Sequence, residues 1–192
     1  YHKSLLKKNI LIFSCRAGNV IGGGDWAKDR LVPDCVRSFS NKKTVILRNP
    51  GSTRPWQHVL EPLSGYLNIA MELSKNNNLN GESFNFGPEA NNDFSVLDVV
   101  KQISKLWENS IWKIQNKDNQ FFESKLLKLN CDKALYNLGW KPSLNFKQTI
   151  KYTVDWYKKF YFDGKDIEQF TINQIVNYQN TAFEKKIKWA HK

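Results

Sequence analysis

The chain has 192 residues, of which 41% are hydrophobic and 14% aromatic. This composition excludes a disordered polymer, and the length is sufficient for one domain with a buried core. The formal net charge is +11, but the lysines are spread along the whole chain and form no single block. That distribution favours a solvated basic surface over a nucleic-acid-binding patch, so we expect no nucleic-acid partner.

Cysteine and histidine are too scattered to predict a disulfide framework or a metal site. None of the three cysteines forms a C-x-x-C pair, and the three histidines are far apart in the sequence (Cys15, Cys35, Cys131, His2, His58, His191). No run approaches the roughly 18 apolar residues of a membrane-spanning helix, and the apolar run at residues 10–13 is too short for a signal peptide. We therefore expect a cytoplasmic protein with reduced thiols and no membrane partner.

Hydrophobic periodicity divides the chain into alternating strands and helices. In chain order, the expected elements are a strand at residues 9–15, a Gly-rich loop at 17–26, a helix at 29–40, strands at 44–48 and 56–59, a helix at 61–74, a loop at 75–81, a strand at 83–86, and helices at 95–107, 132–138, from 145 onward and at 171–178. From residue 185 the chain is charged and is expected to fray. The alternation of strands and helices predicts an α/β fold.

Several helix ends carry local signals. Ser95 with Asp98 has the pattern of a capping box, and Gly139 follows an expected helix at the position where a left-handed residue ends many helices. Asn145 is a favourable N-cap for the next helix. We therefore expect helices to start after Ser95 and Asn145 and a helix to end at Gly139.

The fingerprint of a dinucleotide-binding fold is not found in the chain. That fingerprint is a strand, a G-x-G-x-x-G loop and a helix whose first turn holds a pyrophosphate. Gly22, Gly23 and Gly24 lack this spacing and precede Asp25 and Trp26, not a helix of small apolar residues. The sequence therefore does not predict a cofactor pyrophosphate site in this loop.

Residues 16–26 (RAGNVIGGGDW) resemble a loop of the extended short-chain dehydrogenase/reductases that act on nucleotide sugars, which carry R-x-x-N-x-Y/I-G after a sheet strand. The GGGDW ending is similar to that of the CDP-glucose 4,6-dehydratases. Further segments agree with this family in the same order, namely residues 29–34, 54–67, 84–88, 127–134, 138–142 and 167–178. The agreement of many segments in register makes the resemblance specific.

The resemblance implies a C-terminal portion of an extended short-chain dehydrogenase/reductase. Its fold would be the last strands of a doubly wound sheet plus a small mixed α/β substrate-binding lobe. Residues 1–178 would form the nucleotide-sugar-binding part and residues 179–192 a frayed charged tail, with the N-terminal Rossmann half absent from the chain. In the family, that half contributes most of the NAD site and the helices through which members form homodimers.

The resemblance also implies an activity, the conversion of CDP-glucose to CDP-4-dehydro-6-deoxyglucose by a lyase that uses bound NAD, in a pathway towards surface polysaccharide. The family's Tyr-x-x-x-Lys pair and acid–base residues precede the strand expected at residue 9. Lys3 stands two positions after Tyr1 and does not have the required spacing. We therefore expect no catalytic residue in this chain and no turnover without the missing half. The alternatives are a non-catalytic nucleotide-sugar-binding domain and a fragment of a related nucleotide-sugar epimerase or dehydratase.

The family's substrate-binding residues carry over to specific positions. Asn19 matches an amide at the mouth of the nucleotide-sugar site, and Arg54 matches the arginine that pairs with the pyrophosphate. Arg30 and Leu31 match a segment along the base and ribose. The alternatives are a turn residue for Asn19, a surface arginine for Arg54 and a solvated charge for Arg30.

Three weaker correspondences complete the expected site. Asn85 matches a residue that supports the phosphate-binding arginine, although a strand-end asparagine that bonds its own backbone is equally compatible. Glu123 aligns with a ribose contact in a stretch that departs from the family, and Ala17 lies where the relatives' backbone meets the nicotinamide carboxamide. Trp56 is expected to pack in the core.

Overall fold

The computed structural model describes residues 2–90, 93–115 and 127–191. Its helices are α1 (His2–Leu6), α2 (Leu31–Ser40), α3 (Leu60–Lys75), α4 (Val96–Leu106), α5 (Asp132–Leu138), α6 (Phe146–Lys158) and α7 (Ile167–Glu184), with short 3-10 turns at Asn77–Leu79 and Lys188–His191 and a π-helical turn at Lys159–Asp163. Its strands are β1 (Ser14–Ala17), β2 (Asn19–Ile21), β3 (Val45–Leu47), β4 (Trp56–His58), β5 (Ser83–Phe86) and β6 (Trp112–Ile114).

Within the described residues, the strands pair in parallel as β1 with β5, β2 with β4, and β3 with β6. Parallel pairing requires long crossover connections, and helices supply them, as in an α/β fold. Gly18 separates β1 from β2, so that the chain passes from one strand pair directly into the next. The expected α/β class is therefore confirmed.

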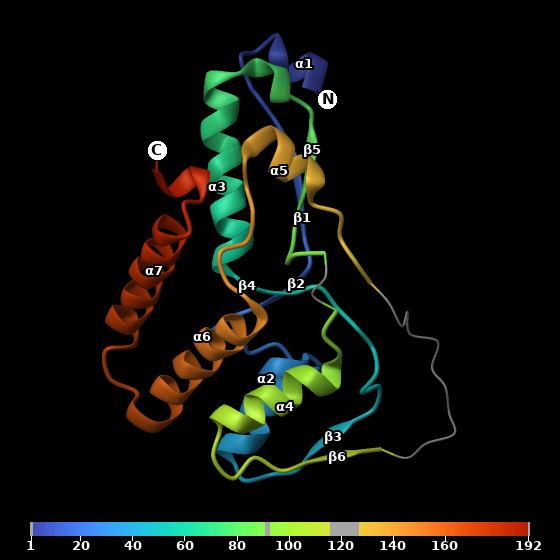
Figure 1. The fold of residues 1–192 in the computed structure, drawn as a ribbon, viewed down its shortest axis with the longest axis vertical. Coiled ribbons are helices and arrows are strands. Elements are labelled where there is room, and N and C mark those ends of the chain that lie inside the picture. The colour runs from blue at the N-terminus through green and yellow to red at the C-terminus, as the bar shows by residue number, and fades with distance from the viewer. Residues whose placement is uncertain (1, 91–92, 116–126, 192) are drawn as a thin grey trace.

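Two hydrophobic cores divide the molecule into two lobes (Figure 1). The first, which we call the α3 lobe, consists of β1, β5, α3 and α5, and its core contains Ile69, Phe84, Phe86, Leu138 and Trp140. The second, the α6 lobe, consists of α2, α4, α6, β3 and β6 around a core that includes Cys35, Val36, Leu47, Val100, Ile103, Ile150 and Tyr157. The β2–β4 pair lies between the lobes, and α7 runs along one side of the molecule.

The local signals for helix ends are confirmed. The Ser95 side chain accepts from the Asp98 backbone N–H while the Asp98 carboxylate accepts from that of Ser95, which forms the expected capping box. Asn145 and Gln148 form a second one. Gly139 ends α5 with φ +62°, where any other residue would be strained.

Some expected boundaries are wrong. Strand pairing starts only at Ser14, not at residue 9, and the Ile10 side chain is 46% exposed. Most of the apolar run therefore precedes β1 and is not part of the strand. The loop expected at residues 75–81 contains a 3-10 turn. Strand β6 was not predicted at all, because three residues with Lys113 between Trp112 and Ile114 give little periodicity.

The region expected as a frayed tail is helical and packed where it is described. Helix α7 starts at Ile167 and continues to Glu184, beyond the expected end at residue 178. Ala182 and Ile187 are buried, and the Trp189 ring stacks on Tyr178 with 5.7 Å between ring centroids. Apolar residues among the charges therefore hold this segment on the α3 lobe.

The searched helices include none with the length and apolarity needed to cross a membrane. Among the described residues, no three His, Cys, Asp or Glu side chains are grouped as metal ligands would be.

Candidate functional site

A cleft of about 520 Å³ opens where β2 and β4 meet the first turn of α2. Its walls are formed by Gly18, Asn19, Val20, Ile21, Asp25, Asp29, Arg30, Leu31, Val32, Pro33, Arg54, Trp56 and Val96. Four residues expected to bind the substrate are among them, namely Asn19, Arg30, Leu31 and Arg54. They come from three separate segments of the chain, which only the fold brings together.

Asn19 begins β2, and Arg54 stands just before the strand β4 that pairs with it. Asn19 is in register with Trp56, and Arg54 stands two residues before Trp56. Gly18 makes this approach possible, because a Cβ there would lie 2.6 Å from the Pro55 carbonyl oxygen. The Arg54 side chain donates from Nη1 to the Thr53 carbonyl at 2.7 Å, and its backbone N–H donates to Phe94. The segment that carries Arg54 is therefore held on the α4 side of the cleft.

Arg30 and Leu31 stand at the start of α2, on another wall. Arg30 is the N-cap residue in extended conformation, and its carbonyl oxygen accepts the first helical bond from Asp34. Its side chain makes no capping bond, so the guanidinium takes no part in starting the helix. The positive end of the helix dipole adds to the Arg30 charge at this wall.

The loop between β2 and α2 is fixed by packing on α6. A Cβ on Gly23 would lie 2.0 Å from the Trp156 ring, so only glycine fits against this indole. The Tyr157 hydroxyl donates to the Asp25 carbonyl at 2.6 Å, and the Trp26 ring packs edge-on against Tyr157. Gly23 of the Gly-rich loop therefore serves packing against the Trp156 indole.

The same packing bears on whether the described residues could hold NAD. Gly23 faces Trp156, and Asp25 and Trp26 follow the glycines where a cofactor fingerprint would need a helix. Ala17, the expected cofactor contact, ends β1 opposite Phe86 and is not part of the cleft wall. The described residues therefore do not form an NAD site by themselves.

Asn85, another expected residue, is not part of the cleft wall. The Asn85 side chain on β5 donates from Nδ2 to the Asn130 carbonyl at 3.0 Å, so it supports the segment after residue 127, neither Arg54 nor its own backbone. Glu123 lies outside the described residues. Trp56 packs in the α6-lobe core as expected and donates from its indole nitrogen to the Phe94 carbonyl at 3.0 Å.

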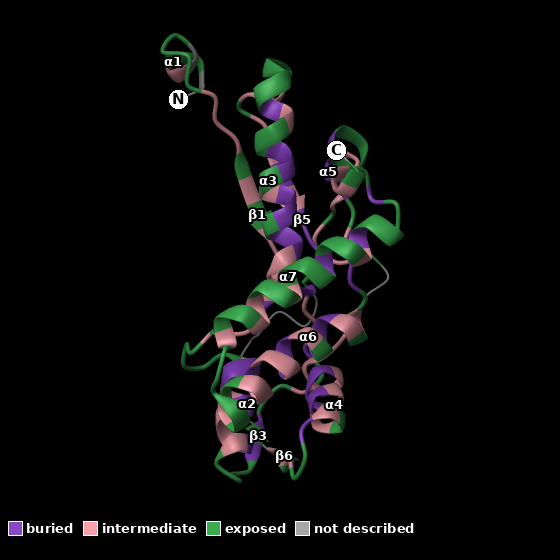
Figure 2. Cartoon of the chain, turned by 90° about the vertical axis from the view of Figure 1, so that its left-hand side faces the viewer, coloured by how far each residue is buried: buried purple, intermediate pink, exposed green. Residues whose placement is uncertain are grey.

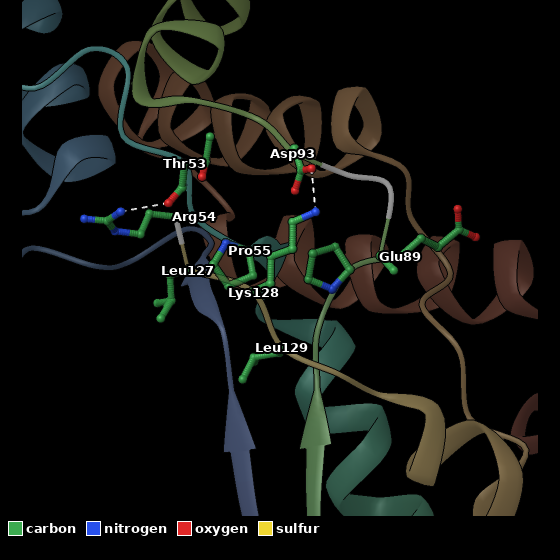
Figure 3. A pocket seen from close by; sticks show the side chains of 10 residues that line it. Thr53, Arg54, Pro55, Glu89, Asp93, Leu127, Lys128 and Leu129 are labelled. Carbon is green, nitrogen blue, oxygen red and sulfur yellow. Dashed lines mark hydrogen bonds and ion pairs between the residues drawn. The ribbon is translucent and has the colours of Figure 1, made fainter. Parts of the chain in front are cut away.

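A second, much smaller hollow of about 40 Å³ adjoins Arg54 on its other side (Figure 3). Lys128 pairs there with Asp93 at 2.6 Å, and in Figure 3 its ammonium points towards Asp93 while the Arg54 guanidinium points away from it. The two cations therefore do not converge on one ligand position in this hollow.

Sequence reasoning missed two acidic residues in the cleft wall, Asp25 and Asp29. Asp29 has φ +61°, which is uncommon for a residue other than glycine, and its carboxylate lies 3.9 Å from Arg48. Both residues stand in motif segments that agree with the family, and their place in those segments was the signal that could have identified them.

The combination of groups suits a ligand with a diphosphate and a nucleoside. Arg54, Arg30 and Asn19 offer donors to phosphate oxygens, while Asp25 and Asp29 offer acceptors to hydroxyl groups. Leu31, Val32, Val96 and Trp56 supply apolar surface for a ring. Such a mixture of apolar wall and few polar groups is typical of a small-molecule site.

The sequence matches no family model. It is 44% identical over 169 residues to a CDP-glucose 4,6-dehydratase of Salmonella typhimurium, covering 88% of this chain and 47% of that enzyme. It is 24% identical over 161 residues to a dTDP-D-glucose 4,6-dehydratase of Bos taurus, covering 80% of this chain and 43% of the relative. The chain thus spans about half the length of the curated relatives it matches.

Solved structures share the fold. A dTDP-glucose 4,6-dehydratase from Bacillus anthracis in complex with NAD superposes with a TM-score of 0.60 at 23% identity, over 82% of this chain and 48% of the enzyme. An epimerase from Methanothermobacter thermautotrophicus superposes with a TM-score of 0.67 at 19% identity, over 83% of this chain and 47% of its own. The resemblance seen in the motifs is therefore confirmed: the chain is homologous to about half of a CDP-glucose 4,6-dehydratase and has the fold of the corresponding part of the extended short-chain dehydrogenase/reductases.

Proposed function

We propose that this chain is the nucleotide-sugar-binding portion of a CDP-glucose 4,6-dehydratase, a lyase that converts CDP-glucose to CDP-4-dehydro-6-deoxyglucose. The cleft between β2, β4 and α2 binds the CDP moiety. Arg54 pairs with the pyrophosphate, Asn19 donates to a phosphate oxygen, and the first turn of α2 lies along the nucleoside.

The observation that carries the proposal is the convergence of Asn19, Arg30, Leu31 and Arg54 on one cleft. These residues were expected to bind the substrate from their sequence context alone, and they are up to 35 positions apart, from residue 19 to residue 54. The 44% identity to a CDP-glucose 4,6-dehydratase supports CDP-glucose as the nucleotide sugar.

The remaining chemistry belongs to the other portion of such an enzyme. That portion holds NAD and supplies the acid–base residues, while this chain binds and orients the sugar nucleotide. Asn85 supports the phosphate side through the segment after residue 127, Ala17 borders the cofactor, and Glu123 contacts the ribose. The complete enzyme is a cytoplasmic homodimer in a pathway that supplies sugars for surface polysaccharide.

Calorimetric titration of the purified chain with CDP-glucose tests the binding role. We expect CDP-glucose and CDP to bind with similar affinity and free glucose not to bind, because the contacts above involve the nucleotide diphosphate. Arg30→Ala should weaken the binding of both nucleotides. Lys147→Ala removes an exposed charge on α6 and should leave both affinities unchanged. Absence of CDP-glucose binding by the folded chain would refute the assignment of the cleft.

A turnover assay separates binding from catalysis. With NAD and CDP-glucose, the chain alone should form no 4-keto product, measured by the ultraviolet absorbance of that product in base. Turnover by the purified chain would contradict the division of labour between the two portions.

A further inference from the structure

Helix α7 exposes a row of large apolar side chains. Ile172, Ile175, Val176 and Phe183 recur at helical spacing and are between 39% and 57% exposed, and we call these four residues the α7 stripe. Figure 2, which shows the molecule from the side of α7, has this helix across the front with mostly exposed residues. Large apolar side chains in such a row are typical of a surface that contacts another protein.

Another side of α7 is held by the rest of the chain. The Trp156 indole nitrogen donates to the Thr171 hydroxyl at 2.8 Å, and the Gln174 side chain donates from Nε2 to the Tyr152 carbonyl at 2.8 Å. Ala182 is buried. These contacts fix which side of α7 faces outward, so the exposure of the α7 stripe does not come from a loosely attached terminal helix.

Basic residues are missing from α7, although the chain is strongly basic. Lys and Arg make up 29 of the 192 residues, yet the 18 residues of α7 include neither, and its charged side chains are Glu168 and Glu184. The exposed face of the neighbouring α6, in contrast, carries Lys147 and Lys151. Depletion of lysine around exposed apolar residues is the composition of a protein interface, not that of a solvated helix face in a lysine-rich chain.

The two ends of α7 are complementary to each other in charge. Asp166 stands just before the helix and Lys186 just after it, and both side chains are exposed. They are equally far from Val176 in the sequence. An antiparallel second copy of α7 therefore brings Asp166 of each copy to Lys186 of the other, with Val176 near the two-fold axis. The negative end of each helix dipole then lies beside the positive end of the other.

We propose that α7 is a self-association surface, through which two copies of this chain pair antiparallel about a two-fold axis close to Val176. The α7 stripe of one copy packs on that of the other, and the contacts between Asp166 and Lys186 at both ends fix the antiparallel direction. A helix with opposite charges at its two ends complements its own copy, which selects a second copy as the occupant. The surface lies apart from the substrate cleft, and its pairing does not depend on which substrate the cleft binds.

Sedimentation equilibrium of the purified chain tests the pairing. We expect a dimer whose population increases with protein concentration. Val176→Glu should raise its dissociation constant about tenfold or more, because it places two carboxylates against each other at the axis. The matched control is Leu67→Glu, which adds the same charge to an apolar position of α3 that is 69% exposed, and which should leave the dissociation constant unchanged. A monomer at every concentration, or equal dissociation constants for wild type and Val176→Glu, would overturn the proposal.

Exchange of the end charges tests the antiparallel direction. Lys186→Asp brings like charges together at both ends and should weaken the dimer about threefold or more, whereas Asp166→Lys/Lys186→Asp restores the attraction and should regain the wild-type dissociation constant. Both positions have left-handed backbone, with φ +50° and +53°, so the exchange places each residue type where the other already stands in that conformation. Circular dichroism of diluted samples, which should be the same for all variants, excludes misfolding. A double variant as weak as Lys186→Asp would refute antiparallel pairing.

Discussion

The hydroxyl group of Tyr178 donates a hydrogen bond of 2.9 Å to the buried carboxylate of Glu61, which joins α7 to the first turn of α3. The same carboxylate accepts the backbone N–H groups of Ser143 and Leu144 at 2.9 and 2.6 Å. Glu61 is 1% exposed. One side chain thus ties together the start of α3, the segment before α6, and α7, and it does so beside the β2–β4 pair that carries the cleft.

We expect Glu61→Ala to destabilise the fold more than any substitution of an exposed glutamate. It would leave the Ser143 and Leu144 N–H groups buried without acceptors, at a cost of about 1–3 kcal/mol for each. Glu61→Gln keeps one oxygen for these donors and should cost less. Urea unfolding of both variants checks the order, with Glu168→Ala on the exposed face of α7 as the control; equal losses for all three would exclude a role for the network.

The same residue predicts a pH dependence. Burial is the largest cause that raises the Glu61 pKa from 4.5 to about 7, although the donated hydrogen bonds and Lys185 oppose it. Between these values the unfolded chain releases a proton that the folded chain retains, so the stabilising contribution is complete below pH 4.5 and is lost as the pH rises through about 7.

Burial acts in the opposite direction on His58, whose pKa falls from 6.5 to about 4, so that its contribution to stability is lost as the pH falls. A comparison of wild type with Glu61→Gln cancels this contribution, because both contain His58. The unfolding free energy of wild type should therefore decline relative to that of Glu61→Gln between pH 4.5 and about 7. A difference that stays constant over this range would show that Glu61 is ionised throughout.

Gly23→Ala should disturb the loop between β2 and α2. The added methyl group would overlap the Trp156 ring, whose indole nitrogen is held by Thr171 at 2.8 Å and cannot easily move. Overpacking of this kind costs about 1–3 kcal/mol and should also weaken CDP-glucose binding, because Asp25 lines the cleft. Gly51→Ala is the matched control, since nothing lies within 4 Å of a Cβ there. Equal melting temperatures for the two variants would contradict this packing role.

Arg54 offers the sharpest test of the cleft. Arg54→Ala should weaken CDP-glucose binding by about ten- to a hundredfold, because charge-assisted hydrogen bonds contribute roughly 1.5–3 kcal/mol each. Arg54→Lys keeps the charge and loses the planar fork, so its affinity should fall between those of wild type and Arg54→Ala. Titration calorimetry, with Lys147→Ala as the charge control, measures the series. Unchanged affinity in both Arg54 variants would show that Arg54 is a surface arginine that does not bind the substrate.

Local patterns in the sequence determined the elements whose ends depend on neighbouring residues. Ser95 with Asp98, Asn145 with Gln148, and Gly139 after α5 act within a single turn, so their effect is visible in the sequence. The apolar periodicity of α2, α3, α4 and α6 likewise follows from which side of each helix is buried.

The site residues were accessible from the sequence only through their motif context. Asn19 and Arg54 belong to segments that resemble one family, and this resemblance, not their spacing, indicated that they act together. Asp25 and Asp29 stand in the same motif segments without a role assigned to them, and their positions in the cleft wall show that they belong to the site.

Tertiary structure decided the rest, because the interactions concerned join residues far apart in the chain. β6 exists because Trp112 and Ile114 pair with β3, and the carboxyl-terminal segment stays ordered because Ala182 and Ile187 are buried. The run at residues 9–15 was apolar enough for a strand, but pairing with β5 begins only at Ser14. A short segment becomes a strand or a packed terminal segment when a distant part of the chain supplies its hydrogen bonds or covers its apolar surface. No local sequence pattern encodes that partner.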